Sequence, residues 1–79
     1  MEKVSKIERL APGLLSVDCV DFGEYYQGQL WSDSKARKTA KCIYSGRPIV
    51  PGDRIYRPVT NKSNRGTRML ASEVDKDYP

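Results

Sequence analysis

Short segments in which apolar and polar residues alternate recur along the chain, and this pattern predicts strands. In residues 14–22 (LLSVDCVDF), Leu15, Val17 and Cys19 alternate with polar side chains. Alternation with a period of two is typical of a strand that buries one face. We therefore expect a strand over these residues, ended by Gly23.

The preceding segment, residues 1–10, is open to two interpretations. Val4, Ile7 and Leu10 recur at a spacing of three, which favours a short amphipathic helix that the following Pro-Gly pair ends. Alternatively, the segment is a first strand, and residues 11–13 form the turn into the next strand.

Residues 24–41 also allow two interpretations. The Ser-Asp-Ser sequence at residues 32–34 is well suited to an N-cap and favours a short helix over residues 35–41. A strand over residues 25–31 is equally consistent with the sequence.

The next segment carries the clearest turn signal. Pro51 and Gly52 suit the two central positions of a type II turn, because proline presets φ and glycine supplies the required positive φ. The flanking residues 49–50 (Ile-Val) and 55–56 (Ile-Tyr) favour strands. A β-hairpin around this turn is therefore expected.

The C-terminal part of the chain returns from a loop to the core. Residues 60–68 (TNKSNRGTR) are rich in turn formers and predict a polar loop. The apolar residues 69–71 re-enter the core, and Ser72 is expected to cap a final helical turn over residues 73–76. The tail, residues 77–79, is expected to fray.

Length and pattern together bound the fold. Seventy-nine residues form one domain at most, with a thin core. We predict a single small basic domain over residues 1–79 that is mainly β, with a small α+β fold as the alternative: a compact antiparallel sheet of four to five short strands with one or two short helices. No segment approaches the ~20 apolar residues that cross a membrane, and the charged N-terminus is unlike a signal peptide. A cytoplasmic protein without membrane contact is expected.

Basic residues are concentrated in the middle of the chain. Residues 34–68 contain ten lysines and arginines and one acid, Asp53, although the net charge of the whole chain is +4. This segregation predicts an acidic partner, either nucleic acid or an acidic protein surface, because so much like charge costs stability through self-repulsion. A solvated face that only keeps the domain soluble is the alternative. The residues predicted to contact the partner are Lys35, Arg37, Lys38, Lys41, Arg47, Arg54, Tyr56, Arg57, Lys62, Arg65 and Arg68.

Tyrosines lie among these basic residues. Single-strand binding surfaces combine phosphate-binding arginines with aromatic rings on which bases stack, and Tyr44 and Tyr56 are candidates for such rings. The alternative is that the two tyrosines pair with each other across the hairpin. Trp31, the only tryptophan, is expected to fill the core.

The chain offers few residues for catalysis or metal binding. It contains no histidine, which removes the commonest general acid–base and excludes Ser-His and Cys-His pairs, so no enzymatic activity is expected. The pattern Cys42-x-x-Ser45-Gly46 resembles a zinc knuckle with its second cysteine replaced, but Cys19 is the only other cysteine and structural zinc takes four ligands. No metal or other cofactor is expected, and both thiols are expected to be free.

A set of short motifs resembles a small proteobacterial domain family of uncharacterised function. The motifs are Cys-x-x-Ser-Gly-x-Pro-Ile at residues 42–49, Gly-Asp at 52–53 and Tyr-Arg-Pro at 56–58. The resemblance covers residues 30–75 and implies a hairpin scaffold and a bacterial or phage origin, but no activity, cofactor or catalytic residue. The charge segregation and the tyrosines among the basic residues predict a non-enzymatic nucleic-acid-binding regulator that uses the basic face of residues 34–68. The alternative is a phage or mobile-element interaction module or inhibitor that docks on an acidic surface of a host nucleic-acid enzyme complex.

Overall fold

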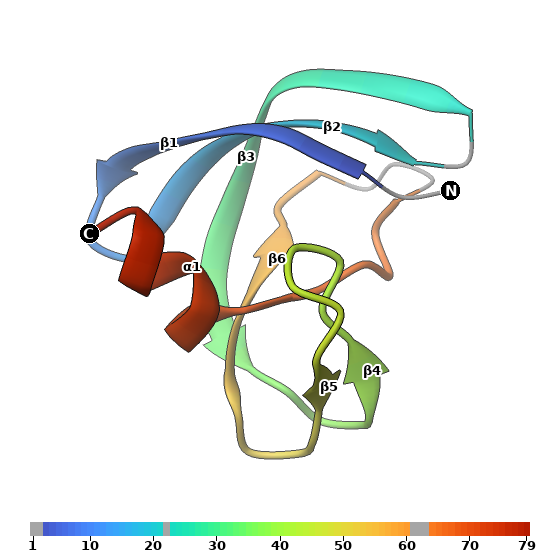
Figure 1. Ribbon diagram of the computed structural model, residues 1–79, viewed down its shortest axis with the longest axis vertical. Coiled ribbons are helices and arrows are strands. Elements are labelled where there is room, and N and C mark those ends of the chain that lie inside the picture. Colours follow the sequence, from blue (N-terminus) through green and yellow to red (C-terminus); the bar gives the residue numbers. More distant parts are fainter. Residues whose placement is uncertain (1–2, 22, 61–63) are drawn as a thin grey trace.

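An antiparallel five-stranded sheet is the main element of the structure, a computed structural model that describes residues 3–21, 23–60 and 64–79 (Figure 1). Its strands lie in the order β1-β2-β3-β6-β7, and the sheet curls into a half-barrel. Two short strands, β4 and β5, pair separately, and the helix α1 follows β7. The prediction of a mainly β fold is confirmed. The elements are β1 (Lys3–Ala11), β2 (Leu14–Asp21), β3 (Glu24–Lys35), β4 (Ala40–Lys41), β5 (Pro48–Ile49), β6 (Arg54–Pro58), β7 (Met69–Leu70) and α1 (Ala71–Asp77).

β1 and β2 form a hairpin, so the strand interpretation of the N-terminal segment is correct and the helix interpretation is wrong. Ile7 lies opposite Val17 in the register, and both side chains are buried. A short isolated helix is marginal in water, whereas this pairing satisfies the backbone along both strands. The turn requires Gly13, because its φ is +76° and a Cβ atom there would lie 2.8 Å from a carboxylate oxygen of Asp33.

β2 and β3 continue the sheet. β2 confirms the strand predicted from residue 14 onward, although Phe22 lies outside the described residues. β3 confirms the strand interpretation of residues 25–31 but extends to Lys35, so the helix expected over residues 35–41 is wrong. Ser34 pairs with Ile55 of β6, and this pairing outweighs the local preference of the Ser-Asp-Ser sequence for a helix N-terminus.

The Pro51-Gly52 turn forms, but it does not close the predicted hairpin. The N–H of Asp53 donates to the carbonyl of Val50 over 3.1 Å, and Gly52 has a φ of +98°. The flanking strands take different partners, since β5 pairs with β4 whereas β6 pairs with β3 and β7. The hairpin prediction is wrong because a turn signal is local and does not select the partner strand. The turn instead contacts the residue that follows β3, because the Gly52 N–H donates to the carbonyl of Ala36 over 2.9 Å.

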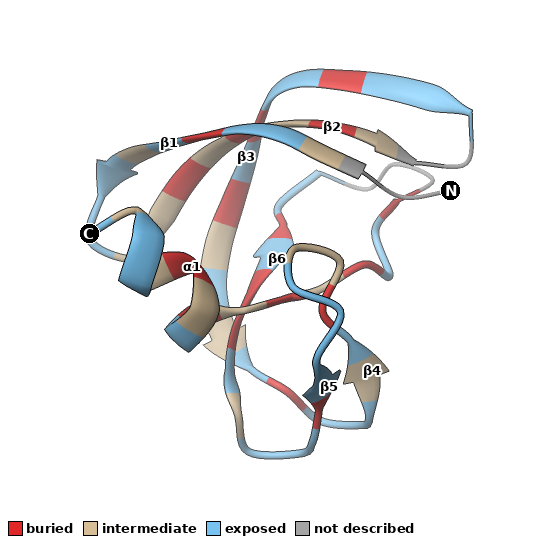
Figure 2. Ribbon diagram, in the orientation of Figure 1, coloured by how far each residue is buried: buried red, intermediate tan, exposed pale blue. Residues whose placement is uncertain are grey.

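The buried core combines side chains from β1, β2, β3, β5, β6 and β7 with side chains of α1 (Figure 2). Trp31 of β3 is fully buried, as predicted, and lies opposite Leu15 of β2 in the register. Val74 of α1 belongs to the same cluster of buried side chains. Cys19 and Cys42 are both buried and are not joined in a disulfide, as predicted.

The C-terminal segment differs from expectation in two ways. α1 begins directly after Leu70, whose backbone is extended, and no described side chain caps its first turn, so the predicted cap at Ser72 is wrong. The expected fraying of the tail is also wrong. The Tyr78 N–H donates to the carbonyl of Val74, and the Tyr78 carbonyl accepts two hydrogen bonds from the guanidinium of Arg9. These contacts tie the end of the chain to β1.

Candidate anion-binding pocket

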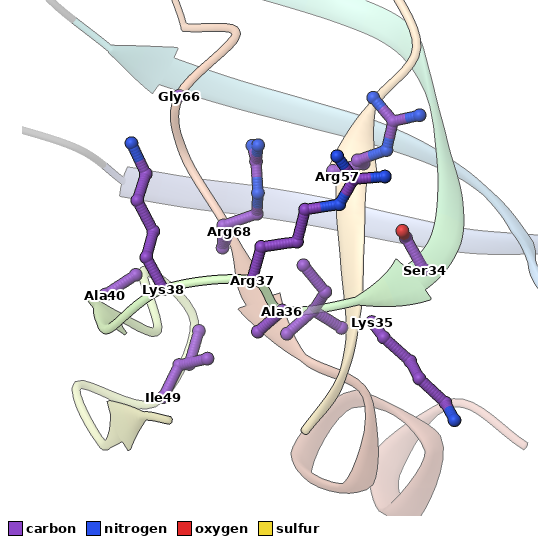
Figure 3. A pocket seen from close by; sticks show the side chains of 11 residues that line it. Ser34, Lys35, Ala36, Arg37, Lys38, Ala40, Ile49, Arg57, Gly66 and Arg68 are labelled. Atoms are coloured by element: carbon purple, nitrogen blue, oxygen red, sulfur yellow. The ribbon is translucent and has the colours of Figure 1, made fainter. Parts of the chain in front are cut away.

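A hollow lies between the ends of β3 and β6, the β4–β5 pair and the loop before β7 (Figure 3). Its volume is about 370 Å³. The hollow forms because β5 pairs with β4, which leaves β5 and β6 apart. The residues that line this hollow, here named the basic pocket, are Ser34, Lys35, Ala36, Arg37, Lys38, Ala40, Ile49, Ile55, Arg57, Gly66 and Arg68.

The basic pocket has a cationic rim. Lys35, Arg37, Lys38, Arg57 and Arg68, all predicted contact residues, line it together, and none of the described lining residues is acidic. In Figure 3 the side chains of Arg37, Lys38 and Arg68 extend toward the same side, whereas that of Lys35 extends away from them. A hollow lined by one sign of charge focuses the electrostatic potential and attracts an anion.

The floor of the basic pocket is apolar. Ala36 directly follows β3, Ile49 lies on β5 and Ile55 lies on β6, and all three are buried. Apolar walls exclude water and strengthen the interaction of the surrounding cations with a bound anion.

Backbone hydrogen bonds fix the segment that carries Arg37 and Lys38. The N–H of Ala36 donates to the carbonyl of Asp53 over 2.8 Å, and the carbonyl of Ala36 accepts from the N–H of Gly52 over 2.9 Å. The Pro-Gly turn therefore positions two of the rim cations, a role that the sequence did not suggest.

Arg68 is held in place by its own backbone and by the loop. The N–H of Ile43 donates to the Arg68 carbonyl over 3.0 Å, and Nη1 of Arg68 donates to the carbonyls of Arg65 and Thr67 over 2.8 and 2.7 Å. Burial lowers the pKa of Arg68 below its ordinary value, and the positive charge of Arg57 lowers it further. Because arginine keeps its proton in proteins, the lowered pKa reflects a positive charge that is held at a cost.

Arg54 and Tyr56 were predicted to contact the partner, but they belong to a network on the other face of the sheet. Arg54 Nη1 lies 2.6 Å from Oδ2 of Asp75, and Arg54 Nε lies 3.3 Å from Oδ2 of Asp33. The hydrogen bond to Asp75 raises the pKa of Arg54 although burial opposes this. Tyr56 is fully buried, and its hydroxyl donates to Oδ1 of Asp75 over 2.6 Å. Since Arg54 and Arg57 are three residues apart on one strand, they point to opposite faces.

The remaining predicted contact residues lie outside the basic pocket. Arg47 is exposed, and its Nη1 lies 3.4 Å from a carboxylate oxygen of Glu73. Lys41 is exposed on β4, and Arg65 is exposed in the loop before β7. Lys62 lies outside the described residues. The contact roles of these four basic residues stay predictions.

Tyr44 and Tyr56 do not pair with each other, so the alternative interpretation of a contact across the hairpin is wrong. The Tyr44 hydroxyl donates to a carboxylate oxygen of Asp77, which raises the pKa of Tyr44 to about 12. The Tyr44 ring meets Tyr78 edge to face, with 6.2 Å between the ring centroids. Among the described residues, no aromatic side chain lines the basic pocket.

Sequence reasoning missed the buried polar network that anchors the loop of the basic pocket. Asn64 is fully buried and exchanges two hydrogen bonds with Gln29 of β3, from Asn64 Nδ2 over 2.8 Å and from Gln29 Nε2 over 3.0 Å. Oε1 of Gln29 also accepts from Nε1 of Trp31 over 3.0 Å. The Asn64 carbonyl accepts from the hydroxyl of Thr67 over 2.6 Å. The sequence did hold one indication of this network. Gln29 lies two residues before Trp31, so on a strand both side chains point to the same, buried face.

Comparison of the chain with protein-family models, curated proteins and solved structures found no match. The resemblance of residues 30–75 to a proteobacterial family therefore stays a prediction. Within the described residues, no three histidine, cysteine, aspartate or glutamate side chains are arranged to hold a metal ion. No helix in the same part of the chain has the length and apolar character that crossing a membrane requires.

Proposed function

We propose that this protein is a non-enzymatic nucleic-acid-binding module that holds phosphate groups of its partner in the basic pocket. The observation that carries the proposal is that Arg37, Lys38, Arg57 and Arg68 surround one hollow without an acidic residue among the described lining. Contacts from arginine and lysine to phosphate supply most of the sequence-independent affinity of nucleic-acid-binding proteins. A cytoplasmic regulator of bacterial or phage origin is part of the same proposal.

The lack of ion pairs at two of the rim cations, within the described residues, supports a binding role. Arg54 and Arg9 each form an ion pair with Asp75, which stabilises the fold. In contrast, Arg57 and Arg68 form no ion pair with any described residue, and their mutual repulsion contributes to the lowered pKa of Arg68. A fold gains nothing from gathering like charges around a hollow, so a bound anion provides the physical reason for the arrangement.

The test is a salt titration of nucleic-acid binding with matched charge variants. The pocket variant combines Lys38→Ala with Arg57→Ala, and the control combines Lys6→Ala with Lys76→Ala, two exposed lysines outside the basic pocket. Both variants lose two positive charges, so a difference between them reports on position and not on net charge. Binding of labelled single-stranded DNA, duplex DNA and RNA is measured by fluorescence anisotropy over a range of salt concentrations.

We expect the affinity of the unmodified protein to fall steeply with salt. If each of the two removed cations neutralises one unit of phosphate charge, the log–log slope of the pocket variant should become shallower by about 1.4–1.8. The control variant should keep the slope. Equal slopes for both variants, with both still folded, would contradict the proposal. Absence of binding to any nucleic acid at low salt would point instead to an acidic protein surface as the partner.

A further inference from the structure

The rim cations converge on one hollow and do not follow a line across the surface. Arg37, Arg57 and Arg68 come from three separate segments and meet at a single cavity of about 370 Å³. This volume is near the lower end of the ~300–1,000 Å³ of small-ligand pockets. It therefore suits one phosphate with its sugar better than a continuous stretch of nucleic-acid backbone. Proteins bind such a stretch with cations arranged along a groove.

A phosphate at the end of a strand matches this hollow better than an internal phosphodiester. A phosphomonoester carries a charge of about −1.5 to −2 at neutral pH and presents three acceptor oxygens. An internal phosphodiester carries one charge and is flanked by nucleotides on both sides. Three guanidinium groups around one cavity supply more charge and more hydrogen-bond donors than a phosphodiester can use.

The fixed orientation of Arg68 favours recognition of a compact, highly charged group. Its Nη1 is engaged by the carbonyls of Arg65 and Thr67, which sets the plane of the guanidinium before any ligand arrives. The backbone of the segment with Arg37 is likewise held in place, by the hydrogen bonds of Ala36 with Asp53 and Gly52. A site that is organised in advance loses little entropy when an anion binds.

The other lining residues are unsuited to reading a base. The apolar lining residues are Ala36, Ala40, Ile49 and Ile55, and the described lining contains no aromatic ring or carboxamide. Base recognition uses hydrogen bonds to base edges or stacking on rings. An apolar floor can instead pack against a sugar, which is the same in every nucleotide of a strand.

We propose that the basic pocket binds the terminal phosphomonoester of a nucleic-acid strand, without preference for base sequence. This inference rests on the proposed function, because it names which phosphate of a nucleic acid enters the pocket.

The test compares short single strands of one sequence that end in a 5′-phosphate, a 3′-phosphate or hydroxyl groups only. We expect a phosphorylated strand to bind at least about tenfold more tightly than the hydroxyl strand, which is the contribution of one added charge-assisted hydrogen bond. The two phosphorylated strands distinguish the 5′ end from the 3′ end. A nucleoside monophosphate should compete with the phosphorylated strand, whereas the nucleoside should not.

Two further measurements separate recognition of the end from general attraction. Arg57→Gln should remove the preference for the phosphorylated strand, while the paired control Lys6→Gln with Lys76→Gln should keep it. Lowering the pH from 7.5 to 5.5 should reduce the preference, because the second proton of a phosphomonoester binds near pH 6.

The possible failures are distinguishable. Equal binding of phosphorylated and hydroxyl strands, together with weaker binding of both by Arg57→Gln, would overturn the end-recognition proposal and leave nucleic-acid binding intact. Absence of binding to every strand would overturn the proposed function and this inference together, even if a phosphorylated peptide bound.

Discussion

Asp75 connects α1 to the sheet, and its replacement tests which interactions hold the fold. Its Oδ1 accepts from Nη2 of Arg9 and from the Tyr56 hydroxyl, and its Oδ2 accepts from Nη1 of Arg54, each over 2.6 Å. The informative changes are Asp75→Asn, which removes the charge, and Asp75→Ala, which also removes the acceptor. Glu8→Gln is a matched control, because Glu8 is an exposed carboxylate on β1.

The expected cost follows from the burial of the partners. Tyr56 is fully buried, so loss of the acceptor for its hydroxyl in Asp75→Ala should cost about 1–3 kcal/mol. The ion pairs with Arg9 and Arg54 are partly exposed and contribute about 0.2–1 kcal/mol each. We expect Asp75→Ala to lower the free energy of unfolding by about 2–4 kcal/mol and Asp75→Asn by about 1 kcal/mol. For a domain of this size, each 1 kcal/mol lowers Tm by about 4–8 °C.

The dependence of stability on pH provides an independent check. Burial raises the pKa of Asp75, but hydrogen bonds from Tyr56, Arg54 and Arg9 outweigh it, and the net effect lowers the pKa below 3.8. A lowered folded-state pKa means that the carboxylate stabilises the fold above its unfolded pKa and that this contribution is lost as the pH falls through the folded value. The stability gap between the unmodified protein and Asp75→Asn should therefore narrow below about pH 4.

Urea unfolding at a series of pH values, followed by circular dichroism, measures both effects. The argument would be refuted if Asp75→Asn were as stable as Glu8→Gln at pH 7. It would also be refuted if the gap between the unmodified protein and Asp75→Asn stayed constant from neutral to strongly acidic pH.

Two further predictions concern the supports of the basic pocket. Gly52→Val should lower the free energy of unfolding by at least about 1 kcal/mol, because φ is +98° while no atom lies within 4 Å of the added Cβ, so the cost is backbone strain alone; an unchanged Tm would contradict the assigned turn. Asn64→Leu should cost about 2–3 kcal/mol in urea unfolding, since it leaves the buried amide of Gln29 without two hydrogen bonds; a loss below about 0.5 kcal/mol would mean that the loop is not anchored there.

The mainly β fold could be predicted from the sequence because strand alternation is a local property. Leu15, Val17 and Cys19 indicated the buried face of β2, and this face is buried in the structure. The pairing of strands could not be predicted in the same way. Pro51 and Gly52 specify a turn through their own φ values, but the choice of β4 or β6 as the partner of β5 depends on contacts between residues distant in sequence.

The candidate site was predictable in composition and not in arrangement. The sequence identified the basic segment, and five of its ten basic residues line one pocket. It could not reveal that Arg54 is paired with Asp33 and Asp75, because these acids lie 21 residues away on either side. It also could not reveal the apolar floor, since Ala36, Ile49 and Ile55 come from separate segments that meet only in the folded chain.

The two faces of β6 explain why basic residues so close in sequence have different roles. Arg54 points toward the acids of β3 and α1, so its charge is compensated and stabilises the fold. Arg57 lies in the basic pocket, where no described lining residue is acidic, so its charge remains available to a ligand. A substitution at Arg54 should therefore reduce stability, whereas a substitution at Arg57 should reduce affinity and leave stability nearly unchanged. A variant that neutralises both arginines together would mix the two effects, and only single substitutions can separate loss of fold from loss of binding.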